Sequence, residues 1–153
     1  MQADSRLSRM LHVLLHMARQ DAPFTSERIG RMLDTNPAVV RRTLAGLRKA
    51  GYVASVPGRG GGWCICVDLS ELTIGDIHRA VGESSVFALH VGEPESRCAV
   101  QRAVSGALAQ TLQEAQALIR RRFEGIKLSE LIRDFDSICR AEGGAESGPG
   151  SGA

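Results

Sequence analysis

The feature that most constrains this chain is a glycine-rich loop between two short apolar stretches. The segment VPGRGGGWCIC, residues 56–66, places four glycines around a single arginine. An apolar stretch precedes the loop, and apolar residues alternate after it from Trp63 to Val67, which predicts two short strands. A phosphate-binding loop is followed by a helix, so the second strand argues against a nucleotide site. Residues 57–62 are therefore expected to form the tip of a β-hairpin.

Composition narrows the class of protein. The chain has 153 residues, enough for one domain or for one small domain with an appendage. Hydrophobic residues make up 43% but aromatic residues only 4%, so the core is expected to be aliphatic. No apolar run approaches the length of about 18 residues that a membrane-spanning helix needs. Four cysteines without a signal peptide favour a reducing, cytoplasmic location over a disulfide scaffold.

Three helices are predicted before the hairpin. Apolar residues recur at helical spacing over residues 5–20, and a second, shorter apolar stripe follows Thr25 and Ser26, either of which can cap a helix. The third helix begins at Pro37, which suits the first helical position, and ends before Gly51. Two short helices joined by a turn of three or four residues form a helix-turn-helix, whose second helix can enter the DNA major groove.

The third predicted helix has two distinct faces. At 100° per residue one face is mostly apolar and comprises Val40, Thr43, Leu44, Leu47 and Ala50. The opposite face, which we call the cationic face, comprises Ala38, Arg41, Arg42, Ala45, Arg48 and Lys49. An ordinary solvated face usually mixes charges of both signs, whereas the stretch from Pro37 to Ala50 contains no acid. This pattern favours DNA contact, because small residues admit the phosphate backbone and arginines reach phosphates or guanine edges.

The charge distribution along the chain agrees with a polyanionic partner for the first half. Residues 1–63 contain ten Lys and Arg against four Asp and Glu, a net charge of +6. The remaining residues contain nine bases and thirteen acids, a net charge of −4. A chance distribution of solvated charge is the alternative. The glycine-rich hairpin that follows the cationic face then has the position of a wing, with Arg59 able to reach a groove.

The candidate DNA contacts lie in the helix-turn-helix and at the hairpin tip. They are Ser26, Thr35, Asn36, Ala38, Arg41, Arg42, Ala45, Arg48, Lys49, Arg59 and Gly60.

The second half of the chain is dominated by a long amphipathic helix, predicted over residues 99–123. It would be roughly 37 Å long, too long for so small a domain to cover. Its apolar stripe therefore needs a partner surface, most simply the same helix of a second subunit. Folding back on its own helix-turn-helix domain is the alternative. The glycine- and serine-rich tail, Gly143 to Ala153, is expected to be disordered.

Three stretches of the chain resemble the Rrf family of winged-helix transcription regulators. They are TSERIGRMLDTNPAVVRRTLAGLRKAGYVASVPGRGGGW, then LTIGDIHRAVGE (residues 72–83) and KLSELIRDF (residues 127–135). The resemblance covers about residues 7–136, and the wing with its preceding leucine-arginine-lysine segment is the most specific part.

The resemblance implies a mostly α fold with a small β-hairpin. A winged helix-turn-helix DNA-binding domain would occupy residues 1–82, a connecting segment 83–98, a dimerisation helix with a short final helix 99–140, and a disordered tail 141–153. It also implies a dimeric bacterial regulator, usually a repressor, that binds double-stranded DNA at a partly palindromic operator. The family pattern crosses the long helices of two subunits and packs each final helix on the other subunit.

The chain departs from the family in its cysteines. Many members bind an iron–sulfur cluster through three cysteines before the long helix, where this chain has only Cys98. Cys64 and Cys66 lie on the second wing strand and Cys139 lies near the end, so no cluster and no other cofactor is expected. Cys98 is either a redox-sensing thiol, favoured by a helix start and the adjacent Arg97, or a packing residue. The alternative to a redox signal at Cys98 is a small molecule that binds the regulator.

A milder departure concerns the wing. Relatives often have an arginine directly before the first wing glycine, where this chain has Pro57. Arg59, two residues later, would then carry the wing's DNA contact alone.

The remaining side chains give no support for catalysis. His12 and His16 have a spacing that can bind a metal, but no third ligand is evident, and exposed histidines without metal are the better interpretation. No residues resemble a catalytic triad or a nucleophile elbow. The alternative to DNA binding is a winged helix that binds another protein, which should show apolar or acidic residues on the outward face of residues 37–50.

Overall fold

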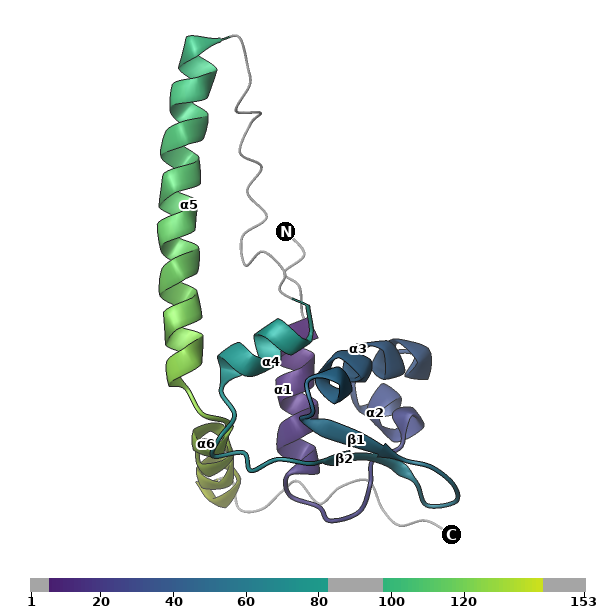
Figure 1. Ribbon diagram of the computed structural model, residues 1–153. Coiled ribbons are helices and arrows are strands. Elements are labelled where there is room, and N and C mark those ends of the chain that lie inside the picture. The colour runs from purple at the N-terminus through teal and green to yellow at the C-terminus, as the bar shows by residue number, and fades with distance from the viewer. Residues whose placement is uncertain (1–5, 83–97, 142–153) are drawn as a thin grey trace.

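The computed structural model describes residues 6–82 and 98–141, and it is built mainly of helices (Figure 1). The prediction of a mostly α fold with one small hairpin is confirmed. The elements, in chain order, are α1 (Arg6–Met17), α2 (Ser26–Met32), α3 (Pro37–Lys49), β1 (Val53–Val56), β2 (Gly62–Ile65), α4 (Ile74–Ala80), α5 (Ala99–Gly125) and α6 (Leu128–Ala141).

Local hydrogen bonds explain where the first helices begin. Of the two candidate caps of α2, Thr25 is the cap, and its hydroxyl oxygen accepts a hydrogen bond from the backbone N–H of Arg28 at 3.1 Å. Asn36 caps α3 in the same way, accepting from the N–H of Ala38 at 2.8 Å, with Pro37 in the first turn as predicted. Such caps satisfy backbone donors that the helix itself leaves unpaired.

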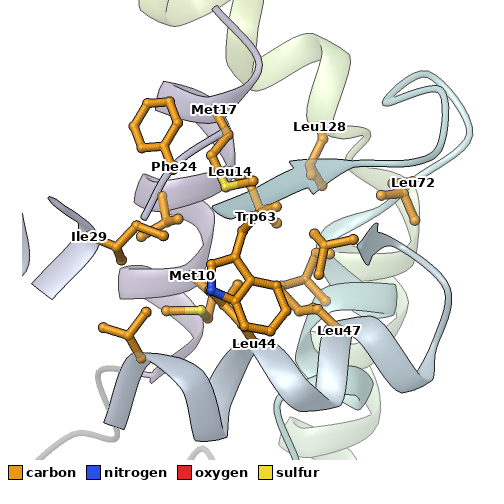
Figure 2. Close-up of a cluster of buried hydrophobic side chains, with 14 residues drawn as sticks. Met10, Leu14, Met17, Phe24, Ile29, Leu44, Leu47, Trp63, Leu72 and Leu128 are labelled. Atoms are coloured by element: carbon orange, nitrogen blue, oxygen red, sulfur yellow. The ribbon is translucent and has the colours of Figure 1, made fainter. Parts of the chain in front are cut away.

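The core lies where α1, α3 and the hairpin meet, with Trp63 at its centre (Figure 2). The apolar face of α3 is confirmed at Val40, Leu44 and Leu47, which are buried, while Thr43 is only half-buried. Ala50 was assigned to this face but is exposed, because α3 ends at Lys49 and Ala50 is its C-cap.

Helix α1 buries one apolar stripe, formed by Met10, Val13, Leu14 and Met17. Leu11 and Leu15 are half-buried at its edge. The helix also ends at Met17, three residues before the predicted end.

The hairpin is antiparallel, and it pairs Val53 with Ile65 and Val56 with Gly62. Phe24, in the segment before α2, forms a bridge to Trp63 and so joins the sheet to the helix-turn-helix. At Gly62 an added Cβ would lie 2.6 Å from the carbonyl oxygen of Phe24. Only glycine therefore lets these backbone segments approach so closely.

Helix α6 is longer than predicted and extends to Ala141. Within the chain it packs on α1; its packing on a second subunit stays a prediction. The ring of His16 lies 5.8 Å from that of Phe135, and Arg19 forms an ion pair with Asp136 at 3.3 Å. The connecting segment up to residue 97 and the tail from residue 142 lie outside the described residues.

Candidate nucleic-acid interface

The turn between α2 and α3 is tightly fixed, and this fixes the direction of α3. Asp34 has a φ of 48°, in the left-handed region. A Cβ added at Gly30 would lie 2.8 Å from the carbonyl oxygen of Thr35. The backbone N–H of Thr35 also donates to the carbonyl oxygen of Gly30 at 2.9 Å. The two helices are thus held in close contact, as a helix-turn-helix requires.

The cationic face of α3 points to solvent. Arg41, Arg42, Arg48 and Lys49 are all exposed, Ala38 is exposed and Ala45 is half-buried. The four cations span both halves of the helix, and the alanines between them leave room for a phosphate backbone to approach. The surface can therefore bind a polyanion along the helix.

One apolar residue beside this face was not among the predicted contacts. Val39 has 44% of its surface exposed, in the first turn of α3. The helical wheel alone did not assign it, because it lies at the boundary between the two faces. An apolar side chain there can contact a thymine methyl group in a major groove.

Glu27 is a second residue that sequence reasoning missed. Its carboxylate lies 3.7 Å from the guanidinium of Arg41, and both side chains are more than half exposed. An exposed ion pair of this kind contributes little to stability, so Arg41 can exchange Glu27 for a phosphate or a base. The pair joins two helices, and so it could be found only after the helix-turn-helix geometry was known.

Ser26 was predicted to contact DNA, but the structure places it in the interior. It is 6% exposed, and its hydroxyl oxygen accepts a hydrogen bond from the indole N–H of Trp63 at 3.0 Å. Ser26 therefore joins α2 to the wing strand, and its side chain is not offered to a ligand. Thr35 is half-buried in the turn, and Asn36 is exposed while its side-chain oxygen caps α3.

The wing tip is a tight turn with an exposed arginine. Residues 57–60 are all exposed, and the N–H of Gly61 donates to the carbonyl oxygen of Gly58 at 3.0 Å. Gly58 and Gly60 have φ angles of 90° and 78°, which side chains rarely adopt. A Cβ at Gly61 would overlap the carbonyl oxygen of Val56. The glycines thus form the tip itself, and Arg59 lies on it.

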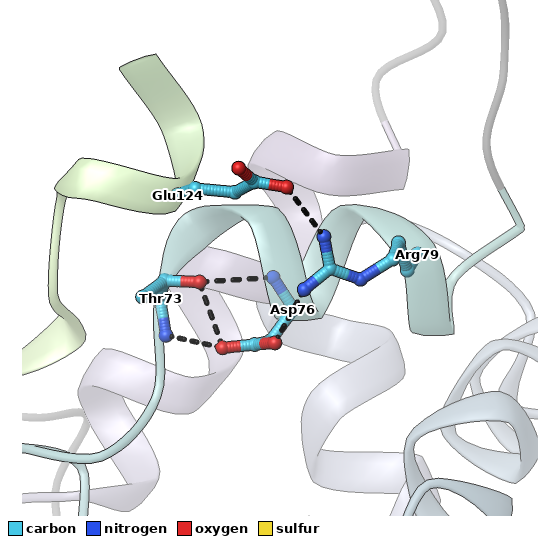
Figure 3. Close-up of polar contacts among 4 residues, drawn as sticks. All are labelled: Thr73, Asp76, Arg79 and Glu124. Carbon is cyan, nitrogen blue, oxygen red and sulfur yellow. Dashed lines mark hydrogen bonds and ion pairs between the residues drawn. The ribbon is translucent and has the colours of Figure 1, made fainter. Parts of the chain in front are cut away.

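A polar network joins α4 to the end of the long helix (Figure 3). Thr73 and Asp76 form a capping box at the start of α4. Arg79 donates to Asp76 at 2.6 Å and to Glu124 of α5 at 3.1 Å. Although partial burial opposes its ionisation, hydrogen bonds from Thr73 and Arg79 hold the pKa of Asp76 below its ordinary value.

Close backbone contacts extend this connection to α3. A Cβ at Gly75 of α4 would lie 3.0 Å from the Cγ of Glu124, so α4 and α5 touch at a glycine. On the other side of α4, a Cβ at Gly46 of α3 would overlap the carbonyl oxygen of Ala80. The end of α5, α4 and α3 therefore form one continuous packed unit.

The long helix leaves apolar side chains uncovered by the described residues. Helix α5 has 27 residues, slightly more than predicted, and its N-terminal part extends away from the body formed by the other helices (Figure 1). Val100 is 72% exposed, and Val104, Leu108 and Leu118 are also exposed. The first three are spaced four residues apart and so share one side of the helix.

The cysteines and histidines occupy separate places. Cys98 is exposed at the N-cap of α5, Cys139 is half-buried in α6, and Cys64 and Cys66 lie on or just after β2. Within the described ranges no three Cys, His, Asp or Glu side chains gather as metal ligands.

The two histidines differ from each other. His12 is exposed as expected, but His16 is half-buried against α6.

None of the described helices is long and apolar enough to cross a membrane.

Relatives support the same architecture. The Serratia proteamaculans transcriptional regulator IscR is 33% identical over 135 residues, which cover 87% of this chain and 77% of that protein. YwnA of Bacillus subtilis is 28% identical over 84% of this chain and 96% of its own length. Among solved structures, IscR of T. potens superposes with a TM-score of 0.63 at 20% identity, covering 98% of this chain and 94% of that one. Staphylococcus aureus CymR in its oxidized form also has a TM-score of 0.63, at 19% identity, over 86% and 96% of the two chains.

A family model extends over most of the chain. Residues 3–134 match the model of the family Rrf2, described as "Iron-dependent Transcriptional regulator". The match includes the helix-turn-helix, the wing, α4 and α5, together with the first part of α6. The chain is therefore a member of the Rrf2 family of HTH-type transcriptional regulators.

Proposed function

We propose that this protein binds double-stranded DNA sequence-specifically, with α3 in the major groove and the wing on the backbone or in the minor groove. The observation that carries this proposal is the exposed cationic face of α3, which contains no acid and is followed by the exposed Arg59 at the wing tip. A winged helix that binds another protein would instead present an apolar or acidic face. Here Val39 is the single large exposed apolar residue of α3, among the four cations.

Salt dependence of DNA affinity tests this proposal. Phosphate neutralisation releases counterions, so the logarithm of the binding constant should fall steeply with the logarithm of the salt concentration. Fluorescence anisotropy of a labelled DNA duplex measures the binding constant at each salt concentration. Replacing Arg41 and Arg42 together by alanine should flatten the slope, whereas the same charge loss at Arg121 and Arg133, on α5 and α6, should leave it unchanged. A slope near zero, or equal loss in both double variants, would contradict the proposal.

The uncovered side of α5 supports a homodimer. Its exposed valines and leucines need a partner surface, and the same helix of a second copy supplies one of matching length and character. A two-fold dimer presents two copies of α3, which matches a partly palindromic operator. Binding of this kind at a promoter excludes polymerase, so repression is the simplest regulatory outcome. We place the protein in the cytoplasm and assign it no catalytic activity.

The cysteine arrangement supports regulation without an iron–sulfur cluster. A cluster needs several thiolates at one place. In this chain Cys98 is the N-cap of α5, Cys139 is on α6 and the other two are on the wing. The donor set therefore does not fit a cluster, and protein purified without air should be colourless. Visible absorption with stoichiometric iron and sulfide would contradict this.

Cys98 is the proposed oxidant sensor, at the N-cap of α5. Oxidation there would add a polar group at the start of the proposed dimer helix. Peroxide should then weaken DNA binding by the unmodified protein but not by Cys98→Ser. If peroxide weakens DNA binding equally in both proteins, or in neither, Cys98 is a packing residue. The regulator would then respond to a small molecule instead.

A further inference from the structure

Two thiols lie together at the base of the wing. Cys64 is on β2 and Cys66 follows it by two residues, so both project from the face opposite the buried Trp63. Cys64 is half-buried and Cys66 is exposed. We call these two residues the thiol pair. Neither residue contributes to the core or to the cationic face.

The side chain of Cys66 turns toward the backbone of Cys64, and the side chain of Cys64 turns toward β1. The Sγ of Cys66 lies 3.8 Å from the carbonyl oxygen of Cys64, and the Sγ of Cys64 lies 3.7 Å from the carbonyl oxygen of Ala54. The two thiols thus lie next to each other along one face of the chain.

A disulfide does not suit this geometry. Alternate residues of a strand have Cα atoms about 6.6 Å apart, at the upper end of the distances that disulfides span. Their Cβ atoms also point in parallel, which strains the bond. A metal ion between the two sulfurs removes this difficulty, because two metal–sulfur bonds of about 2.3 Å each bridge a wider gap.

The surroundings restrict which ion could bind. No third Cys, His, Asp or Glu joins the pair among the described residues, so the site cannot supply the four ligands of structural zinc. Soft thiolates select soft ions such as Cu(I), which accepts two sulfur ligands. We propose that Cys64 and Cys66 form a two-thiolate binding site for a soft monovalent cation, Cu(I).

Cu(I) binding to the thiol pair involves no oxidation or reduction. Each thiol loses its proton to solvent, two metal–sulfur bonds form, and the neutral pair becomes a site with one net negative charge. This charge appears on the strand that leads out of the wing tip, where the register sets Cys64 opposite Ala54. A consequence that rests on the proposed function is weaker DNA binding, because the new charge opposes a nearby phosphate backbone.

The binding site is tested without DNA. The variant with Cys98→Ser and Cys139→Ser keeps the thiol pair as its only cysteines. Titration with Cu(I) in the absence of air, against a chromophoric competing chelator, should give one ion and two released protons per chain. Ag(I) in chloride-free buffer serves as a redox-inert check.

Two further variants identify the ligands. Cys66→Ser and Cys64→Ser, each made in that background, should lower Cu(I) affinity by about 10²-fold or more, since the second thiolate binds at a high effective concentration. Cys66 is exposed, so its variant should fold normally by circular dichroism. Full affinity after either replacement, half an ion per chain, or no binding against the chelator would each overturn the proposal.

The effect on DNA is measured separately. One equivalent of Cu(I) should weaken binding by about threefold to tenfold in the two-cysteine protein and leave Cys66→Ser unaffected. If Cu(I) binds but DNA affinity is unchanged, the regulatory consequence is wrong while the metal site stands. If the metal-free protein binds no DNA at all, the proposed function is wrong, and the metal titration is unaffected by that result.

Discussion

Arg42 and Arg48 are both exposed on α3 but lie in different halves of the helix. Residues in the first turns of a recognition helix contact base edges, so Arg42→Ala should weaken binding and relax preference at one base pair by about 1–3 kcal/mol. Arg48 is in the last turn, nearer to phosphates, and Arg48→Ala should weaken all sequences alike. Mobility-shift titrations on single-base variants of the operator distinguish these effects. Unchanged binding in both variants would refute the assignment of this face to the groove.

Ser26 makes a prediction about stability. Ser26→Ala would leave the buried indole N–H of Trp63 without its acceptor, which costs about 1–3 kcal/mol. The free energy of unfolding in urea should fall by that amount. Ser55→Ala, at an exposed position of β1, is the matched control and should change it little. Equal stability of the two variants would mean that the hydrogen bond is not a structural link.

At the scale of elements, α3 and α4 meet at Gly46. Alanine in a helix interior normally stabilises by about 1 kcal/mol relative to glycine. Here its Cβ would overlap the carbonyl oxygen of Ala80, so Gly46→Ala should lower the unfolding free energy and the DNA affinity together. In Gly125→Ala nothing lies within 4 Å of the added Cβ, so this variant should lower neither the unfolding free energy nor the DNA affinity. Thermal unfolding followed by circular dichroism checks the first effect. A stabilised Gly46→Ala protein would show that the two helices can separate freely.

Elements whose patterns are local could be predicted from the sequence, and those that depend on distant partners could not. The hairpin follows from its glycines and alternation, and α3 from Pro37, its apolar stripe and Gly51. The burial of Ser26 depends on Trp63, which is 37 residues away. The pairing of Glu27 with Arg41 depends on how two helices cross.

Helix α6 shows the same limit. Its amphipathic sequence indicates a helix but does not say which apolar surface it covers. The contacts of Phe135 with α1 and of Asp136 with Arg19, just after α1, became evident only in the folded structure.

At the scale of the whole molecule, the long helix should hold two copies together. Leu112→Asp places a charge within the apolar stripe of α5 and should give a monomer or an unfolded chain, because a buried unpaired carboxylate is costly. Tight operator binding should then be lost, since the two half-site affinities no longer combine. Gln113→Asp, the same charge at an exposed neighbouring position, should leave the dimer intact. Sedimentation velocity checks both, and an unmodified protein that is monomeric at micromolar concentration would contradict the proposal.

Because α5, α4 and α3 are packed in series, the arrangement of two long helices would set the distance between two recognition helices. Selection of bound duplexes from a random DNA pool tests this central claim most directly. The account predicts enrichment of two half-sites related by a two-fold axis, with centres about 10 base pairs or a multiple of one turn apart. It also predicts that the protein with Arg41→Ala and Arg42→Ala does not enrich them. Failure of the unmodified protein to enrich any sequence, or equal enrichment by the double variant, would contradict it.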